Sequence, residues 1–320
     1  MLKEKILFVL YNEDDWGADI PLKASPDTRL SFEEFYTLAK VQGVSVFRAH
    51  IDWYNTATQS FSKAWTFDDG AWKKVTDPPK PTALFDKIAG KYGFSLFEKK
   101  MDMSRHFSLL NSPTFRAFFD NKFNQYLVFG EWMPCSYLAE NKEQFLHVLE
   151  QVASTKVVTK LLYGSGGKEV VIDSKEVLSK KDFHYPIIVQ EFIPTAGVPG
   201  FSPAKEIADL RLVFINHELI YALSRVAKGN SLFTNFHQGA TAVLVPTDRI
   251  PEGCLVMAKK IQTKLTQFEK AHYSLDFMFT TEGKPLFIEM NTTPGFDLLR
   301  IIGTPELCKE HTKKLLALFF

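Results

Sequence analysis

One segment near the end of the chain restricts the fold more than any other, because it predicts an antiparallel hairpin that carries acidic side chains. Two apolar-rich runs, residues 274–280 and 285–290, flank the turn pair Glu282-Gly283. A turn centred on that pair places Asp276 directly opposite Glu289, on one side of the two-stranded ribbon. The chain must therefore accommodate two facing carboxylates on neighbouring strands.

Facing carboxylates repel each other, and a divalent cation turns that repulsion into a binding site. Asn291 lies two residues beyond Glu289 and projects from the same face of the strand. The all-oxygen set of Asp276, Glu289 and Asn291 suits Mg²⁺ rather than Zn²⁺. The alternative is an exposed acidic pair at a strand end that water relaxes, and this segment alone slightly favours it.

A second segment combines a lysine in an apolar strand with a glycine-rich loop. Lys160 shares a strand face with Val158 and Leu162, so its ammonium group lies among apolar neighbours and needs an anion. The strand runs into Gly164-Ser165-Gly166-Gly167, whose bare amides could wrap a polyphosphate. The loop matches neither GxxxxGK[ST] nor GxGxxG, and a flexible turn with a solvent-reaching lysine is the alternative.

A third segment places two arginines on successive strands. Arg211 follows Asp209 in one strand and Arg225 lies in the next, with a turn around Asn216-His217 between them. Both arginines therefore lie at the far ends of one ribbon, where they repel unless they share an anion such as phosphate or carboxylate. Salt bridges to Asp209 or Glu218 are a structural alternative of equal weight.

The amino-terminal third predicts the strand–helix–strand start of an α/β layer. A buried strand at residues 5–11 precedes an acidic loop, and a helix begins with Ser31 as N-cap and Glu34 at the capping-box position. That helix ends near Gln42-Gly43, before a strand at residues 44–49. Other predicted elements are a hairpin at 64–75, helices at 113–130, 142–152, 252–271 and 305–318, and strands at 156–162, 169–173, 187–191, 210–215 and 218–225.

Composition excludes several classes of protein. The chain has 320 residues with 38 Lys+Arg against 37 Asp+Glu, a net charge of +1 that argues against a nucleic-acid or polybasic membrane-surface binder. The three cysteines form no CxxC pair, so we expect small buried hydrophobes in a reducing compartment rather than disulfides or a zinc site. No apolar run approaches the roughly 18 residues of a membrane span, so the expected location is the cytoplasm.

In their order and spacing, these segments resemble the ATP-grasp superfamily. The resemblance is closest to the branch of carboxylate–amine ligases that contains ribosomal-protein glutamate ligase and glutathione synthetase, and it covers about residues 105–300. The motifs that carry it are Asn111-Ser112-Pro113, Lys122, Lys160 with its glycine loop, Gln190-Glu191-Phe192-Ile193, Asp209-Leu210-Arg211, Arg225, Asn235 and Asp276 with Glu289-Met290-Asn291-Thr292-Thr293-Pro294-Gly295.

The resemblance implies an α/β fold (α+β lobes) in three parts. Residues 1–105 would form an amino-terminal pre-ATP-grasp α/β domain. Residues 106–193 would form a central lobe with the phosphate loop, and residues 194–320 a carboxyl-terminal lobe with the metal site. The two lobes would clasp ATP between them. The stretch 194–208, which holds three prolines and two glycines, is expected to be a functional or mobile loop.

The resemblance also implies roles for single residues. The groups expected to contact the nucleotide are Lys122 and Lys160 at the α- and β-phosphates, Gly164, Ser165, Gly166 and Gly167 over the phosphates, Gln190, Glu191, Phe192 and Ile193 as a hinge at the adenine edge, and Asp209. Those expected to hold two Mg²⁺ ions, with Mn²⁺ as an alternative, are Asp276, Glu289 and Asn291. Those expected to stabilise charge during catalysis are Arg211, Arg225 and Asn235.

The activity that the resemblance implies is an ATP- and magnesium-dependent ligase. A carboxylate attacks the γ-phosphate to give an acyl phosphate and ADP, and an amine then displaces phosphate to give an amide or peptide bond. The substrates would be small molecules or peptides, such as amino acids. Two alternatives are an ATP-binding regulatory or scaffold protein and an ATP-dependent small-molecule kinase. The scaffold is favoured by Phe233 and Gln238, which replace basic residues of the branch.

Substrate choice is expected to lie with the amino-terminal part and the 194–208 loop. Asp14, Asp15 and Trp16 follow the first strand at its carboxyl end, where open α/β sheets place ligand contacts. They suggest a cationic or amine-bearing substrate, and a solvated acidic loop is the alternative. Relatives in this superfamily are often dimers or tetramers, so a homo-oligomer is one expected form.

Overall fold

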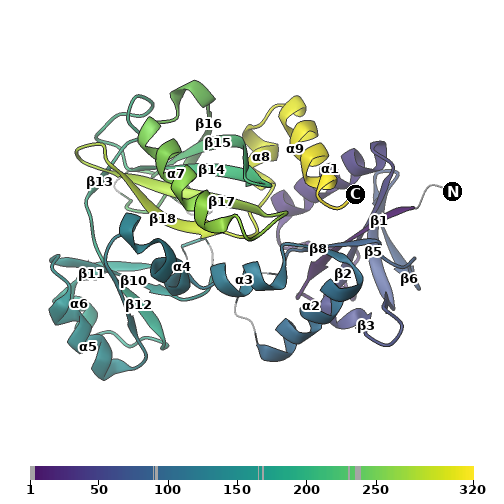
Figure 1. The fold of residues 1–320 in the computed structure, drawn as a ribbon, viewed down its shortest axis with the longest axis horizontal. Coiled ribbons are helices and arrows are strands. Elements are labelled where there is room, and N and C mark those ends of the chain that lie inside the picture. Colours follow the sequence, from purple (N-terminus) through teal and green to yellow (C-terminus); the bar gives the residue numbers. More distant parts are fainter. Residues whose placement is uncertain are drawn as a thin grey trace.

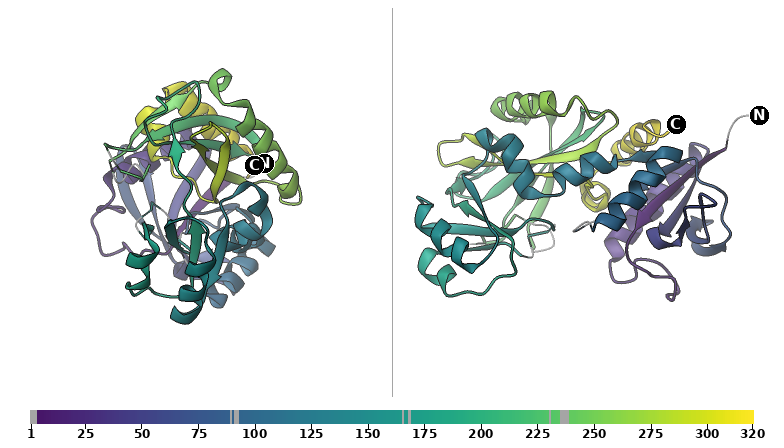
Figure 2. Two further views of the ribbon diagram at one scale, coloured as in Figure 1. Left: turned by 90° about the vertical axis from the view of Figure 1, so that its left-hand side faces the viewer. Right: turned by 60° about the horizontal axis from the view of Figure 1, so that its bottom comes forward.

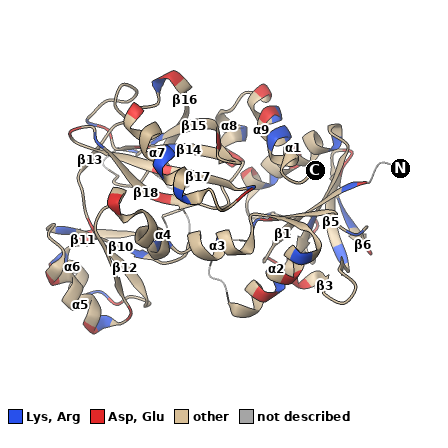
Figure 3. Cartoon of the chain, in the orientation of Figure 1, with Lys and Arg blue, Asp and Glu red and all other residues tan. Residues whose placement is uncertain are grey.

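Three β-sheets, each with its own layer of helices, organise the protein in this computed structural model (Figure 1). The structure describes residues 4–88, 90, 93–164, 166–167, 169–229, 231–234 and 239–320. Charged residues of both signs occur on all three parts in the view of Figure 3, as the near-neutral net charge requires. Within the described ranges, no helix has the length and apolar character needed to cross a bilayer.

The amino-terminal sheet has the strand order β6-β5-β2-β1-β7-β8. The strands β2, β1, β7 and β8 are parallel, and β5 and β6 form an antiparallel hairpin beside β2, with β6 at the edge. The strands are β1 (Lys5–Tyr11), β2 (Val44–His50), β5 (Lys63–Asp68), β6 (Ala71–Thr76), β7 (Ala83–Asp86) and β8 (Ser108–Leu110), and a small ribbon joins β3 (Tyr54–Asn55) to β4 (Ser60–Phe61). The predicted first two strands and the hairpin around Asp69-Gly70 are confirmed.

The first helix, α1 (Pro26–Val41), begins earlier than predicted. Ser25 is the N-cap and Pro26 occupies the first turn, where its fixed φ angle is already helical and its missing N–H costs nothing. The prediction that Ser31 caps this helix is therefore wrong. Ser31 lies inside α1, is 3% exposed, and donates its hydroxyl to the Thr28 carbonyl. A second helix, α2 (Phe94–His106), was not predicted.

The central sheet is antiparallel, with the order β11-β10-β12-β9. Its strands are β9 (Ser136–Ala139), β10 (Lys156–Leu161), β11 (Val171–Ser174) and β12 (Ile187–Glu191), and α5 (Lys142–Gln151) and α6 (Lys175–Ser179) cover one face. The helix predicted at 113–130 is broken into α3 (Pro113–Phe119) and α4 (Lys122–Phe129). Asn121 causes the break, because its side chain accepts the Phe123 and Asn124 amides and caps α4.

The carboxyl-terminal sheet is also antiparallel, with the order β13-β17-β14-β15-β16 and β18 paired to β17. Its strands are β13 (Thr195–Ala196), β14 (Ala208–Ile215), β15 (Glu218–Val226), β16 (Thr241–Val245), β17 (His272–Thr280) and β18 (Pro285–Asn291). The helices of this part are α7 (Glu252–Leu265), α8 (Asp297–Ile302) and α9 (Pro305–Ala317). The 194–208 stretch thus contributes a short edge strand, β13, that pairs with the end of β17.

The amino-terminal sheet takes part of its core from the far end of the chain. Leu315 and Leu316 of α9 pack in one cluster with Leu7 and Phe85, and α9 contacts α1 directly. The right-hand view of Figure 2 shows α9 between the amino-terminal and carboxyl-terminal sheets. The division at 105 and 193 stays a proposal, and β8 and α9, which lie beyond residue 105, join the amino-terminal sheet and its core.

Two buried histidines lie at this junction. His272 and His311 are 1% and 2% exposed, and their ring centroids are 5.5 Å apart, beside Phe296. Burial is the largest cause that lowers the pKa of His311 to about 3 and the pKa of His272 well below its usual value. Both side chains are therefore neutral in the folded protein at physiological pH.

We expect this pair to make the protein less stable in mild acid. Unfolded histidine has a pKa of about 6.5, so the unfolded state takes up protons below that pH and the folded state does not. The stabilisation is complete above about pH 6.5 and falls by about 2 kcal/mol per histidine down to about pH 5. Urea unfolding at several pH values measures this slope. His311→Leu should flatten it and His147→Leu, on the exposed face of α5, should leave it unchanged.

Candidate active site

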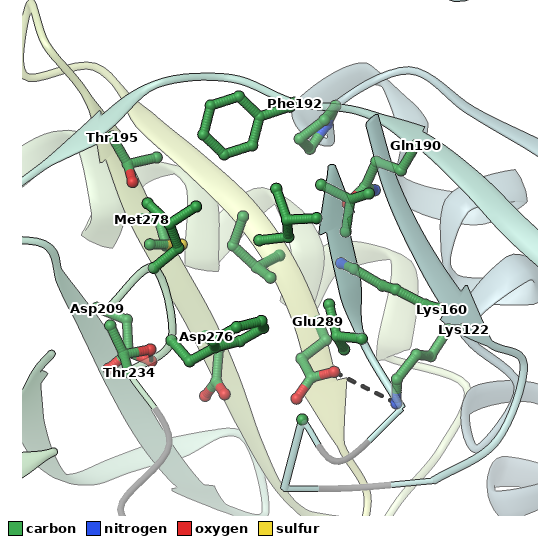
Figure 4. Close-up of a pocket in the computed structure, with 18 of the residues that line it drawn as sticks. Lys122, Lys160, Gln190, Phe192, Thr195, Asp209, Thr234, Asp276, Met278 and Glu289 are labelled. Carbon is green, nitrogen blue, oxygen red and sulfur yellow. Dashed lines mark hydrogen bonds and ion pairs between the residues drawn. The ribbon is translucent and has the colours of Figure 1, made fainter. Parts of the chain in front are cut away.

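A deep cleft separates the central sheet from the carboxyl-terminal sheet, and its free space, including the open mouth, is about 1170 Å³. Figure 4 shows one end lined by Gln190, Phe192, Thr195 and Met278 and the other by charged side chains. We call this space the inter-sheet cleft. Apolar side chains line one end of the cleft, and lysines and carboxylates line the other end.

The hairpin β17–β18 supplies the carboxylates at the polar end. Asp276 pairs with Glu289 as predicted, but through a β-bulge rather than through a regular ladder. Phe277 pairs with Phe287, so Ile288 is the extra residue between the two pairs. The bulge turns both Ile288 and Glu289 into the cleft, whereas strict alternation would bury Glu289 in the core.

The three predicted metal ligands lie together. The Asn291 amide nitrogen is 3.4 Å from Asp276 Oδ2 and 3.4 Å from Glu289 Oε1, and rotating this amide presents its oxygen instead. In the described part of the chain, no group of three His, Cys, Asp or Glu side chains could hold a metal ion. The donor set is two carboxylates and one carboxamide, and these hard oxygen donors fit Mg²⁺ with further ligands from water or phosphate.

Both predicted catalytic arginines are engaged with acidic residues of the same site. Arg211 binds Asp276 through two bonds of 2.7 and 2.6 Å. Arg225 binds Asp209, with a shortest bond of 2.5 Å, and also reaches Asp276 Oδ2 at 2.9 Å. Burial raises the pKa of Asp276, but the two guanidinium charges outweigh it and hold the pKa below its usual value.

The two arginines share an anion within the protein itself. The anion they share is the side chain of Asp276, and the predicted alternative of a bridge from Arg225 to Asp209 is also present. The Thr234 hydroxyl donates a further hydrogen bond of 2.6 Å to the Asp209 carboxylate. Glu218 takes no part, because it pairs with Lys314.

The two predicted phosphate lysines converge on Glu289. Lys122 Nζ lies 3.3 Å from Glu289 Oε2 and donates to the Gly164 carbonyl at 2.7 Å (Figure 4). Burial lowers the pKa of Lys160 to about 8, while the charge of Glu289 raises it and that of Lys122 lowers it. Burial likewise raises the pKa of Glu289, but Lys122 and other nearby cations outweigh this effect. Both ammonium groups line the cleft, and an anionic ligand bound there would neutralise their charge.

The glycine loop borders the same end of the cleft. Gly164, Gly166 and Gly167 have φ angles of 124°, 75° and 67°, which side-chain-bearing residues rarely adopt. Gly164 and Gly166 line the inter-sheet cleft together with Lys122. The predicted site residues Ser165 and Asn235 and the replacement Gln238 lie outside the described residues. Phe233 lies inside them and lines the cleft.

The predicted hinge, residues 190–193, spans the end of β12 at the apolar end of the cleft. The Gln190 carboxamide donates to Ser136 Oγ, so it supports the sheet. The Glu191 amide donates to the Cys135 carbonyl and the Phe192 amide to Ser154 Oγ. The amides of Glu191 and Phe192 are therefore already bonded within the protein, and the expected pairing with adenine requires other backbone groups of the hinge. Cys135 is exposed, against the expectation of three buried cysteines.

Sequence reasoning missed a residue that holds the metal-site strand in place. Gln125 of α4 donates to the Met290 carbonyl and accepts the Met290 amide, between Glu289 and Asn291. Asn111, quoted only as part of a motif, donates to the Thr292 carbonyl. Gln125 thus takes the place of a neighbouring strand beside β18, and Asn111 bonds to the chain just beyond the end of β18. No pattern identifies Gln125, because its partner is 165 residues away.

A second cavity of about 1790 Å³ of free space, open to solvent, adjoins the cleft. It lies among the carboxyl end of β1, the start of α1 and the segment after β18, and we call it the second cavity. The residues that line both spaces are Lys122, Gly164, Gly166, Arg225 and Glu289. Of the two predicted metal-binding carboxylates, Glu289 therefore stands where the two spaces meet, and Asp276 lines the inter-sheet cleft.

The acidic loop after β1 has a structural use. Asp15 accepts from Arg48 and from the Trp65 indole, and the Asp14 carboxylate accepts the Trp16 amide. Of this loop, Asn12 and Glu13 line the second cavity, while Asp14 and Asp15 do not. The expectation that those two aspartates and Trp16 bind a cationic substrate therefore has no support in the geometry.

Comparisons with known proteins agree with the predicted family and fold. A family model for the RimK-like ATP-grasp domain matches residues 130–309. The chain belongs to this family. The predicted family and the predicted α/β ATP-grasp fold are confirmed.

The similarity to individual proteins is lower. A probable alpha-L-glutamate ligase of Legionella pneumophila (strain Corby) is 28% identical over 171 residues, which are 52% of this chain and 51% of that protein. The chain thus spans about half the length of the curated relatives it matches.

Two solved structures share the fold over nearly the whole chain. D-alanyl-alanine synthetase A from Vibrio cholerae O1 biovar eltor (strain N16961) has a TM-score of 0.64 at 11% identity, with 98% of this chain and 99% of that one covered. A Chryseobacterium gregarium RiPP-associated ATP-grasp ligase, in complex with ADP and a leader and core peptide, has a TM-score of 0.57 at 15% identity, covering 98% and 96%. At these identities the likeness concerns the fold alone.

Proposed function

We propose that the protein is an ATP- and magnesium-dependent carboxylate–amine ligase that forms an amide or peptide bond and releases ADP and phosphate. One observation carries the proposal. The inter-sheet cleft and the second cavity adjoin, and Glu289 and Arg225 line both of them, while Asp276 lines the cleft. A nucleotide in the first and a carboxylate in the second would bring their reacting ends together there.

The nucleotide would lie in the inter-sheet cleft with its base at the apolar end. Phe192, Met278 and Leu286 supply the flat apolar walls for a base. The carbonyl of Glu191 and the amide of Ile193 are the hinge groups that we assign to the adenine edge. Lys122 and Lys160 would neutralise the phosphates, and the glycine loop would approach them closely through bare backbone.

The metal ligands would be Asp276, Glu289 and Asn291. When bound, Mg²⁺ supplies positive charge that stabilises the phosphoryl group during transfer. Arg211 and Arg225 lie beside the same carboxylates, so their guanidinium groups would stabilise negative charge on the acyl phosphate. No protein nucleophile is required, and the residues act by positioning, by charge and by keeping water out.

The substrates would occupy the second cavity. The relatives are named probable alpha-L-glutamate ligases, and one structural neighbour holds a leader and core peptide. We therefore propose an amino acid or a peptide as substrate, with glutamate as the first to test.

An assay of nucleotide products tests this function. ATP, Mg²⁺ and a panel of amino acids, dipeptides and their mixtures should give ADP and phosphate in an amine-dependent manner, together with an amide product by mass spectrometry. AMP and pyrophosphate would contradict the acyl-phosphate route. A phosphorylated product with no amine requirement would instead identify a small-molecule kinase.

A second candidate is an ATP-binding protein without ligase turnover. Phe233 lines the cleft at a position where the family branch has arginine, and Arg211 and Arg225 are both committed to Asp276. This candidate predicts saturable MgATP binding by calorimetry with no ADP release across the whole panel. Exchange of Phe233→Arg should then create turnover if the missing cation is the reason.

A further inference from the structure

Lys87 lies at the carboxyl end of β7 and lines the second cavity, away from the inter-sheet cleft. The carboxyl ends of parallel strands are the edge at which open α/β sheets place ligand contacts. Arg211 and Asn291 line the same cavity. Lys87 lines the second cavity and not the inter-sheet cleft, where we place the nucleotide.

Every contact of the Lys87 ammonium group that the structure shows is with a neutral group. Its Nζ donates to the Pro294 carbonyl at 2.8 Å and to the Thr293 carbonyl at 3.3 Å. It also lies 5.4 Å from the ring centre of Phe85 and 5.0 Å from that of Phe296. In the described parts of the chain, no carboxylate forms an ion pair with it.

The other cations around the second cavity differ from Lys87 in this respect. Lys122 pairs with Glu289, Arg211 with Asp276 and Arg116 with Asp120. Each of these cations has a carboxylate partner within the protein.

Two carboxylates, Asp297 and Asp86, influence the pKa of Lys87, and both bond to other side chains. Asp297 accepts the hydroxyls of Thr28 and Ser31. Asp86 pairs with Lys100 and Arg116. Burial lowers the pKa of Lys87 to about 7, with smaller effects that raise it from Asp297 and Asp86 and lower it from Arg116. Lys87 is half-buried, and a half-buried amine with neutral partners gains from an incoming anion, which favours its positively charged form.

We propose that Lys87 binds a carboxylate of the substrate that is not the carboxylate to be phosphorylated. The reacting group must lie at Glu289 and Arg225, which line both spaces, whereas Lys87 lines only the second cavity. The substrate that enters here therefore carries a free, non-reacting carboxylate. It is either an amino acid or peptide that supplies the amine, or a dicarboxylate that supplies the acyl group. This inference rests on the proposed ligase function.

Matched pairs of compounds distinguish the two sources. The probes are L-amino acids against their α-amides for the amine side, and L-glutamate and succinate against glutamine and succinamate for the acyl side. The variants are Lys87→Met, which removes the charge, and Lys87→Arg, which keeps it, with Lys80→Met on the exposed surface as control. Thermal unfolding of each variant checks that the fold is kept.

In steady-state kinetics we expect Lys87→Met to raise the KM of the carboxylate-bearing substrate by about 10- to 100-fold, the effect of one charge-assisted hydrogen bond. The KM for ATP should stay within about twofold. The preference for the acid over its amide should disappear in Lys87→Met and return in part in Lys87→Arg. A preference that survives intact in Lys87→Met overturns the proposal.

A second measurement does not depend on turnover. Acetylation of Lys87 by acetic anhydride is followed by mass spectrometry in the presence of ADP and Mg²⁺. We expect a carboxylate probe to slow it and the matched amide not to. If no probe supports ADP release but carboxylates protect Lys87, the site stands and the ligase function fails. If ADP is released and no carboxylate protects Lys87, the ligase stands and the site is wrong.

Discussion

Replacing Glu289 by glutamine should reduce ADP release by about 100-fold or more while the fold is kept. Glu289 stands at the meeting point of the inter-sheet cleft and the second cavity, 3.3 Å from Lys122 and paired across the hairpin with Asp276. The change keeps the shape of the side chain and removes one negative charge from the proposed metal site. Loss of one charged contact to the transferring group costs about this factor in other enzymes.

The matched control is Glu282→Gln, in the turn of the same hairpin, where the carboxylate is exposed and far from the cleft. Its ADP release should equal that of the unchanged protein. Calorimetric titration with Mg²⁺ and a non-hydrolysable ATP analogue should show weakened metal-dependent binding for Glu289→Gln only. Full activity in Glu289→Gln would remove Glu289 from the metal site.

The second large effect concerns stability. Arg225→Met should lower the free energy of unfolding by about 3 to 5 kcal/mol, because it leaves buried carboxylates without a counter-charge. The side chains of Asp209 and Asp276 are only 5% and 4% exposed, and Arg225 bonds to both. Arg211 still holds Asp276 in this variant, so Asp209 carries most of the cost.

The pH dependence separates this charge effect from lost packing. Without Arg225, burial raises the pKa of Asp209 further, so the folded state takes up a proton that the unfolded state does not hold near neutral pH. The destabilisation should therefore shrink as the pH falls from about 7 to about 5. Urea unfolding of Arg225→Met and of the exposed control Arg249→Met measures it. A loss that stays constant with pH would show that packing, and not charge, is the cause.

The cross-strand pairing of Asp276 with Glu289 shows how much of the site local sequence patterns can predict. The turn pair and the apolar runs predict a hairpin, and both partners lie within one short segment of the chain. The pairing is correct, but the β-bulge at Ile288 makes it so and turns Glu289 out of the core. A bulge depends on the twist of the assembled sheet, so local patterns contain no reliable signal for it.

The helix errors have the opposite cause, competing signals within the sequence itself. Ser31 and Glu34 match a capping box, but the earlier Ser25-Pro26 pair begins α1. The helix predicted at 113–130 ignores the capping power of Asn121, which divides it. In each case both signals are visible, and only packing of the whole helix selects between them.

The sequence by itself determined the family, the hairpin and the identity of the charged residues, because each depends on residues that are close in the chain or on motifs in a set order. Tertiary structure alone decided which charges neutralise one another. In the folded chain, Asp276 pairs with Arg211 and Arg225. Asp15 pairs with Arg48, and the ammonium group of Lys87 contacts carbonyl oxygens and aromatic rings. Electrostatic energy depends on distance in space and on burial, and neither can be read from separation along the chain.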